Sequence, residues 1–268
     1  MKRQVPQYSA TLRRYFLQYT RYMLGRSFHA VSIRNERPSP ITTARLPLLI
    51  AINHSSWWDL LVAGWLDSYL FGRESYGVMD ATQLERYALF KRMGVIGVDR
   101  SSISGAQRFL TTCRELLVDS DRTLWITPQG EICSSYRRPI RFQPGLAHIA
   151  TAIQSFQYCH AAFHYEFGDE RLPEVFVQFS QPCAVEIQSL RTAKQWLRSM
   201  EKALEDDLNE LQSAVQFQRS EEFTTLISGG GGTVALYDLY RKAQARIAGR
   251  PFYSLHGDIK TPPWRNRR

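Results

Sequence analysis

Short apolar runs alternate with longer amphipathic segments through the middle of the chain. The apolar runs have the length of strands and lie at 47–52, 76–80, 95–98, 123–127, 158–167 and 174–181. The segments between them have a helical pattern and lie at 57–70, 83–93, 102–119 and 145–154. Short apolar runs bounded by turn residues are typical of strands buried on both faces. The alternation predicts an α/β fold with a mixed, largely parallel sheet flanked by helices, whose functional sites lie at the carboxyl ends of the strands.

Helical and polar segments flank this core. Residues 5–30 have the pattern of an amphipathic helix, 35–46 form a connection rich in Pro, Ser and Thr, and 190–218 predict a long helix with a polar face. We therefore divide the chain into three parts. They are an N-terminal amphipathic helical segment with its connection (1–45), an α/β core (46–185) and a C-terminal helical extension with a basic tail (186–268).

Four consecutive glycines, 229–232, interrupt the C-terminal extension. They are not followed by the Gly-Lys-Ser/Thr of a phosphate-binding loop or by a buried strand. We interpret them as a hinge before a helix at 233–247. The tail from Pro251 to Arg268 is rich in arginine at its end, which suits an anionic surface.

The chain of 268 residues has a formal net charge of +9 and an isoelectric point near 9.5, which favours an anionic partner. Arginines at 13, 14, 21 and 26 are interleaved with aromatic and aliphatic residues in the first helical segment. Such a helix either lies in a membrane interface or packs on the core. No zinc-finger spacing or RNA-binding strand pattern is present, so we predict a membrane surface and no nucleic acid as partner.

Neither a membrane-spanning run nor a cleavable leader is apparent in the sequence. We therefore expect a cytoplasmic protein that is peripheral on the inner face of a membrane. Its four cysteines, at 113, 133, 159 and 183, are dispersed, which predicts reduced thiols. His160 and His164 share one face of a strand, but no third ligand lies at a suitable spacing, so we predict packed histidines and no metal.

The segment Asn53-His54-Ser55-Ser56-Trp57-Trp58-Asp59 directly follows the apolar run 47–52. His54 and Asp59 could not meet if both lay in one regular helix. They can meet if His54 lies in the turn and Asp59 in the first helical turn. The carboxylate then fixes the imidazole tautomer, and the other ring nitrogen can take a proton from an alcohol. The alternative is a helix cap beside a packed imidazole.

This segment, NHSSWWD, resembles the H-x4-D signature of the glycerolipid acyltransferase family, which includes lysophosphatidic acid and glycerol-3-phosphate acyltransferases. A second block, Gly94-Val95-Ile96-Gly97-Val98-Asp99-Arg100, resembles the family's strand ending in Asp-Arg. The resemblance implies that His54 is the general base and that Asp59 orients it. It also implies that Arg100 holds an anionic group of the acceptor, whereas the alternative for Arg100 is a surface ion pair with Asp99.

The third block, at 126–134, departs from the family pattern. Gln129 stands where the family has glutamate and Ile132 where it has arginine. Either an arginine of the following loop replaces the missing cation, or the acceptor lacks a phosphate. The loop arginines are Arg137, Arg138 and Arg141. We count Asn53, Gln129, Gly130, Glu131, Arg137 and Arg138 with Arg100 as candidate substrate-binding residues, although Glu131 suits a solvated loop equally well. The best counterpart of the fourth block, 158–165, lacks the family's proline.

The resemblance implies a membrane-peripheral O-acyltransferase without a cofactor. It would move a fatty acyl group from a thioester, acyl-CoA or acyl-carrier protein, to the hydroxyl of a 1-acylglycerol-3-phosphate-type lipid. One alternative keeps the reaction but uses an acceptor without phosphate, such as a glycosylated terpenoid or carotenoid. Another is a catalytically silent module that binds lipid or thioester, against which the retention of His54 and Asp59 argues. The sequence makes no prediction about oligomeric state.

Overall fold

The computed structural model describes residues 8–34, 37–39, 46–118, 120–168, 170–229 and 246. The strands are β1 Ala30–Arg34, β2 Leu48–Ile52, β3 Ser75–Asp80, β4 Val95–Val98, β5 Thr123–Ile126, β6 Ser155–Glu166, β7 Glu174–Phe179, β8 Cys183–Glu186 and β9 Phe223–Ser228. The α-helices are α1 Ala10–Ser27, α2 Asp59–Leu70, α3 Ala81–Arg86, α4 Ile103–Leu117, α5 Gly145–Ile153 and α6 Leu190–Gln216. Two short 3₁₀ helices are η1 Ala88–Met93 and η2 Ser220–Glu222.

The described strands form one nine-stranded sheet with the order β4-β3-β5-β2-β6-β7-β1-β9, and β8 pairs with β6 outside this path. Pairing is parallel between β2 and both β5 and β6, between β3 and both β4 and β5, and between β1 and β7. It is antiparallel where β6 meets β7 and β8 and where β1 meets β9. The predicted mixed, largely parallel sheet flanked by helices is therefore confirmed. The carboxyl ends of β2, β3, β4 and β5 meet at one edge of this sheet.

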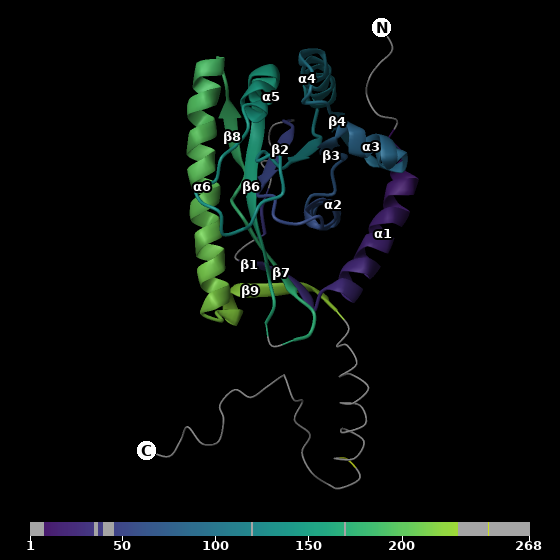
Figure 1. The fold of residues 1–268 in the computed structure, drawn as a ribbon, viewed down its shortest axis with the longest axis vertical. Coiled ribbons are helices and arrows are strands. Elements are labelled where there is room, and N and C mark those ends of the chain that lie inside the picture. The colour runs from purple at the N-terminus through teal and green to yellow at the C-terminus, as the bar shows by residue number, and fades with distance from the viewer. Residues whose placement is uncertain are drawn as a thin grey trace.

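Two apolar cores cover the two faces of the sheet, because successive residues of a strand point to opposite faces. In β2, Leu49 and Ala51 join the core shared with α4, α5 and α6, whereas Leu48, Ile50 and Ile52 join the core beneath α2. Leu24 and Phe28, at the end of α1, belong to that second core. Figure 1 shows the result, with α6 and α1 on opposite sides of the sheet.

Serine side chains cap the N-termini of three of the helices. Ser9, Ser102 and Ser189 are the N-caps of α1, α4 and α6, and each hydroxyl accepts a hydrogen bond from a backbone N–H in the first turn. Such a cap satisfies one of the otherwise unpaired N–H groups at a helix start. Helix α2 has no side-chain cap from its N-cap residue, Trp58. Its first residue, Asp59, instead bonds the loop that precedes it, as described below.

The structure departs from the predicted elements at a few places. Strands β1, β8 and β9 were not predicted, and the predicted helix 5–30 ends at Ser27 so that β1 can begin at Ala30. The predicted helix 83–93 is split into α3 and η1 at Tyr87, whose backbone is not helical. The predicted helix at 233–247 and the basic tail fall almost entirely outside the described residues. From 186 to 229 the predicted C-terminal extension packs on the sheet through α6 and pairs with it through β9.

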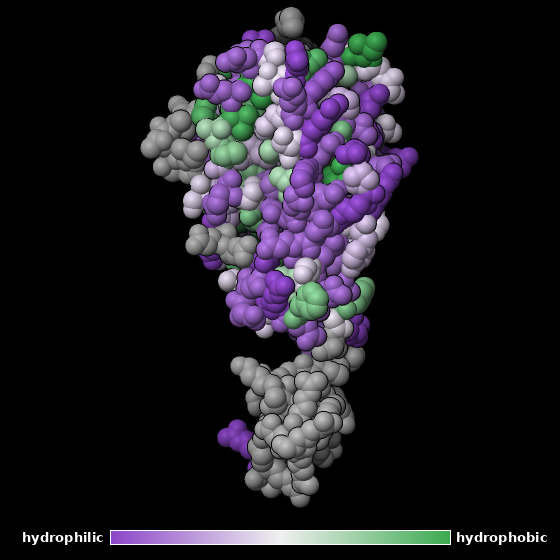
Figure 2. Space-filling model, turned by 90° about the vertical axis from the view of Figure 1, so that its left-hand side faces the viewer, coloured by the Kyte–Doolittle hydropathy of each residue, from purple (hydrophilic) through white to green (hydrophobic). Residues whose placement is uncertain are grey.

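The long helix α6 has the predicted polar outer face. Leu197, Leu204, Leu208 and Leu211 are buried on its inner side. Figure 2, which views the molecule from the side of α6, shows a largely hydrophilic surface there. Among the described residues, no helix combines the length and the apolar character needed to cross a bilayer.

Candidate active site

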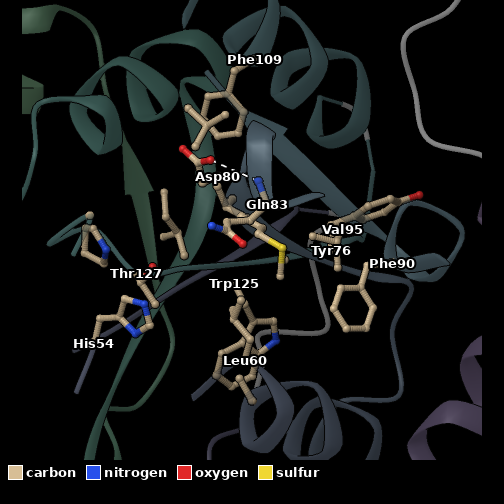
Figure 3. A pocket seen from close by; sticks show the side chains of 18 of the residues that line it. His54, Leu60, Tyr76, Asp80, Gln83, Phe90, Val95, Phe109, Trp125 and Thr127 are labelled. Carbon is tan, nitrogen blue, oxygen red and sulfur yellow. Dashed lines mark hydrogen bonds between the residues drawn. The ribbon is translucent and has the colours of Figure 1, made fainter. Parts of the chain in front are cut away.

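A cavity of about 850 Å³ opens at the carboxyl ends of β2, β3, β4 and β5. Its apolar lining includes Phe16, Leu17, Leu60, Leu61, Tyr76, Val78, Met79, Phe90, Phe109, Leu110, Trp125 and Ile149. Figure 3 shows His54 and Thr127 at one end of the cavity and Tyr76, Phe90 and Val95 at the opposite end. A cavity of this size and character is typical of sites for largely apolar ligands.

His54 and Asp59 lie in the positions that the sequence predicts. His54 is in the turn after β2, and Asp59 is the first residue of α2. The His54 Nδ1 atom lies 2.7 Å from Asp59 Oδ2, and the Asp59 carboxylate is fully buried. Because a carboxylate accepts, Nδ1 carries the hydrogen and Nε2 keeps its lone pair. The His54 side chain is 18% exposed and lines the cavity, so this nitrogen is available to a ligand.

The Asp59 carboxylate is anchored by three more hydrogen bonds. Its Oδ2 atom accepts from the backbone N–H groups of Ser55 and Ser56, at 2.8 and 2.9 Å. Its Oδ1 atom accepts from the hydroxyl of Tyr165, at 2.6 Å. Sequence reasoning missed Tyr165, because it lies 106 positions from Asp59 and no spacing rule connects them.

Gln129 supports the backbone of the turn that bears His54. Its Oε1 atom accepts from the His54 backbone N–H at 2.7 Å, and its Nε2 atom donates to the Cys133 sulfur at 3.0 Å. The Cys133 backbone N–H in turn donates to the His54 carbonyl at 2.9 Å. The Gln129 side chain therefore holds His54 in place and is not part of the cavity wall.

Arg100 lies at the cavity and contacts the third block. Its Nη1 atom donates to the Gly130 carbonyl at 2.6 Å, and both residues line the cavity. A glycine is needed at 130 because its φ is +76° and because a Cβ there would lie 2.6 Å from Arg100 Nη1. Asp99 does not pair with Arg100, as the surface alternative would require. Asp99 accepts from Ser101 and Ser102, and these hydrogen bonds lower its pKa to about 2.

Asn53 lies away from the cavity, although we counted it as a candidate substrate-binding residue. It is 2% exposed, and its amide exchanges two hydrogen bonds with the backbone of Phe163. These bonds join the end of β2 to β6. Both ends of the amide are therefore occupied by protein.

The loop arginines that could replace Ile132 also point elsewhere. Arg137 pairs with Glu131 at 3.0 Å on the exposed surface. Arg138 bonds Asn209 and Gln212 of α6, and Arg141 lies 3.5 Å from Glu201 of the same helix. None of these loop residues lines the cavity, whereas Ile132 does. The replacement of the missing cation by a loop arginine is therefore not seen in this arrangement.

Helix α1 contributes a wall of the cavity through Arg13, Phe16 and Leu17. Arg13 is buried, and its guanidinium donates to the carbonyl and hydroxyl oxygens of Ser75 and to Asp67 Oδ2, at 3.3 Å in the last case. Burial raises the pKa of Asp67, which Trp125 also bonds through its indole N–H. The guanidinium of Arg13 is thus already paired with groups of the protein.

His160 and His164 both pair with carboxylates. His160 Nε2 lies 2.7 Å from Asp207 on α6, and His164 Nε2 lies 3.1 Å from Glu166. No cluster of three or more His, Cys, Asp or Glu side chains suited to a metal occurs within the described part of the chain. The four cysteines are free thiols, and burial raises the pKa of Cys159 to about 12.

Fold and site together define an α/β enzyme with a histidine–aspartate pair at the end of an apolar cavity. Comparison with known proteins agrees, because residues 31–160 match the family model described as Acyltransferase. These residues belong to the acyltransferase family, and the protein is an acyltransferase enzyme. The matched range contains His54, Asp59, Arg100 and Gly130 and ends before Tyr165. No curated protein matches the chain.

Proposed function

We propose that the protein is a membrane-peripheral O-acyltransferase that moves a fatty acyl group from a thioester to a lipid hydroxyl. The observation that carries the proposal is the position of His54. Its ring is oriented by a buried carboxylate and lies at the end of a large apolar cavity. The donor is acyl-CoA or acyl-carrier protein, and no cofactor takes part.

The reaction is a direct transfer with His54 as general base. The His54 Nε2 atom takes the proton of the acceptor hydroxyl while its oxygen attacks the thioester carbonyl carbon. The ester C–O bond forms, the C–S bond breaks, and the thiolate receives the proton back from the imidazolium. Asp59 stabilises the imidazolium through Nδ1–H and keeps the ring in one tautomer. No covalent acyl-enzyme is needed.

The cavity accepts the fatty acyl chain. Aliphatic and aromatic side chains dominate its lining, and each buried methylene contributes about 0.8 kcal/mol. With the chain in the cavity, the thioester carbonyl lies at the His54 end. The polar part of the donor then remains toward solvent.

The preferred acceptor is a 1-acylglycerol-3-phosphate-type lipid, and Arg100 binds its phosphate. Arg100 is exposed, and among the described residues its side chain donates one hydrogen bond, to the Gly130 carbonyl, so its other N–H groups are available to a ligand. The forked guanidinium suits phosphate oxygens. Loop arginines 137, 138 and 141 are not counted in this site, because each is paired outside the cavity.

A second candidate acceptor is a lipid alcohol without phosphate, such as a glycosylated carotenoid. The observation that favours it is the shortage of cations at the cavity. Two arginines line the cavity among the described residues. Arg13 is buried and bound to Asp67 and Ser75, so of these two only Arg100 has free N–H donors. A phosphate monoester carries nearly two negative charges and normally meets more than one cation.

Acceptor kinetics separate the two candidates. If the acceptor is a phospholipid precursor, Arg100→Ala should raise the KM for lysophosphatidic acid at least tenfold, equivalent to about 1.4 kcal/mol of binding. Arg137→Ala is the matched control, since Arg137 pairs with Glu131 outside the cavity, and its KM should be unchanged. If lysophosphatidic acid does not react while a neutral lipid alcohol does, the second candidate replaces the first.

Membrane attachment is proposed through the outer face of α1. Tyr15, Tyr19 and Tyr22 form one stripe and are 55–67% exposed, with the exposed Arg14 and Arg26 beside them. Aromatic and basic residues on one helix face favour an anionic membrane interface. The inner face of the same helix lines the cavity, so a lipid leaving the interface would have a short path to the site.

Liposome flotation tests this attachment. Deleting residues 1–30 is unsuitable, because it would also remove the buried Arg13. The triple variant Tyr15→Ser, Tyr19→Ser, Tyr22→Ser changes only exposed side chains and should reduce binding to anionic vesicles, whereas Phe217→Ser, an exposed aromatic of the region after α6, should not. Equal binding by the triple variant and the native protein would refute an α1 interface.

A further inference from the structure

The two oxygens of the Asp59 carboxylate have different environments. Oδ2 accepts from His54 Nδ1 and from the backbone N–H groups of Ser55 and Ser56. Oδ1 has one hydrogen-bond donor among the described residues, the hydroxyl of Tyr165 at 2.6 Å. A fully buried carboxylate requires donors on both oxygens, and a short bond to an ionised oxygen is a strong one.

Tyr165 is well placed to direct this carboxylate. It lies near the end of β6, on the face of the strand that bears Ala161 and Phe163 and packs toward the core beneath α2. Its ring contacts the ring of Phe28, with centroids 5.9 Å apart, so the phenol approaches Asp59 from a packed position. Burial and the nearby Asp59 carboxylate raise the pKa of the Tyr165 phenol well above its usual range, so the hydroxyl stays protonated and donates.

We propose that Tyr165 is a positioning residue of the catalytic pair. By bonding Oδ1, its hydroxyl fixes the rotation of the Asp59 carboxylate and thereby aims Oδ2 at His54 Nδ1. Tyr165 acts through Asp59 and does not touch the substrate. The inference rests on the proposed function of His54, and Tyr165 lies beyond the range matched by the family.

The test is Tyr165→Phe, which removes the hydroxyl and keeps the ring on Phe28. Removing a hydrogen bond to a charged group should lower kcat about tenfold to a hundredfold, with the KM of donor and acceptor unchanged. Tyr158→Phe is the matched control on the same strand, because the buried Tyr158 hydroxyl has no hydrogen-bond partner among the described residues. This control should keep the native kcat.

A double-mutant cycle with His54→Ala separates positioning from a general structural effect. If Tyr165 acts only through the catalytic pair, Tyr165→Phe should cause no further loss in the residual activity of His54→Ala. An equal fractional loss in both backgrounds, or a native kcat in the single Tyr165→Phe variant, would overturn the inference while leaving the role of His54 intact. Native activity of His54→Ala would overturn the proposed function and the inference with it.

Discussion

Replacement of Arg13 by leucine should destabilise the protein strongly, because the change leaves a buried carboxylate without its cation. Asp67 is fully buried, and Arg13 is its ion-pair partner at 3.3 Å. Removing one partner of a buried pair typically costs about 3–5 kcal/mol. The same change removes the donors to Ser75, which faces the guanidinium with two oxygens.

This loss is large compared with the whole stability of a domain, which is about 5–15 kcal/mol. Urea unfolding followed by circular dichroism measures it directly. Arg14→Leu is the matched control, because Arg14 is the next residue of α1 but is exposed, and its effect should be within about 0.5 kcal/mol. The double variant Arg13→Leu, Asp67→Asn should recover part of the loss, since the uncompensated charge is gone.

The destabilisation should also depend on pH. Burial raises the pKa of Asp67 in the folded protein, and the charge of Arg13 opposes that rise. Without Arg13 the pKa of Asp67 in the folded state should rise further, so the folded state binds the Asp67 proton more strongly than the unfolded state does. Stability should then fall as pH rises from the unfolded-state pKa, about 4, toward the folded-state pKa. The deficit of Arg13→Leu should therefore be smaller near pH 4 than at pH 7. A variant within about 1 kcal/mol of the native protein at pH 7 would refute the reasoning.

Two further predictions concern the cavity and a buried histidine. A Cβ at Gly77 would meet only Leu60 Cδ2, at 3.9 Å, so Gly77→Ile should fill cavity space and lower kcat/KM for long acyl thioesters at least about tenfold relative to short ones. Gly77→Ala should leave the ratio of kcat/KM between long and short acyl thioesters unchanged. If Gly77→Ile has the chain-length preference of the native protein, the cavity is not the acyl site. Burial lowers the pKa of His164, so the folded state binds fewer protons than the unfolded state and the free energy of unfolding should fall as pH decreases through about 6.5. In urea titrations at a series of pH values, His164→Gln should reduce that fall. The same dependence of the unfolding free energy on pH in this variant and in the native protein would contradict this account.

The parts of the fold set by local pattern could be predicted from the sequence. The apolar run 47–52 places β2 and the turn that bears His54, and the spacing to Asp59 predicts their contact once the helix start lies between them. Strand β9 was missed because its burial is partial and its pairing with β1 joins segments about 190 residues apart. Such long-range pairing leaves no periodic signal in either segment.

The candidate site shows the same division. Resemblance to the family's sequence blocks made His54, Asp59 and Arg100 candidate site residues, and they lie in the turn after β2, at the start of α2 and just after β4. The bond from Tyr165, the tie of Gln129 to the backbone of His54 and the burial of Arg13 all depend on tertiary packing. From the sequence, an arginine in an amphipathic helix is expected to face solvent. Only the position of Asp67 and Ser75 beneath α1 shows that Arg13 is buried.

Thioester-dependent acyl transfer by purified His54→Ala tests the central claim most directly. The assay follows release of the free thiol and formation of the acylated lipid, with matched unfolding curves as the check on folding. His29→Ala is the control, since His29 does not line the cavity and should keep the native rate. If His54 is the general base, its loss should reduce kcat by about 10²- to 10⁴-fold. Native turnover by folded His54→Ala would contradict the account.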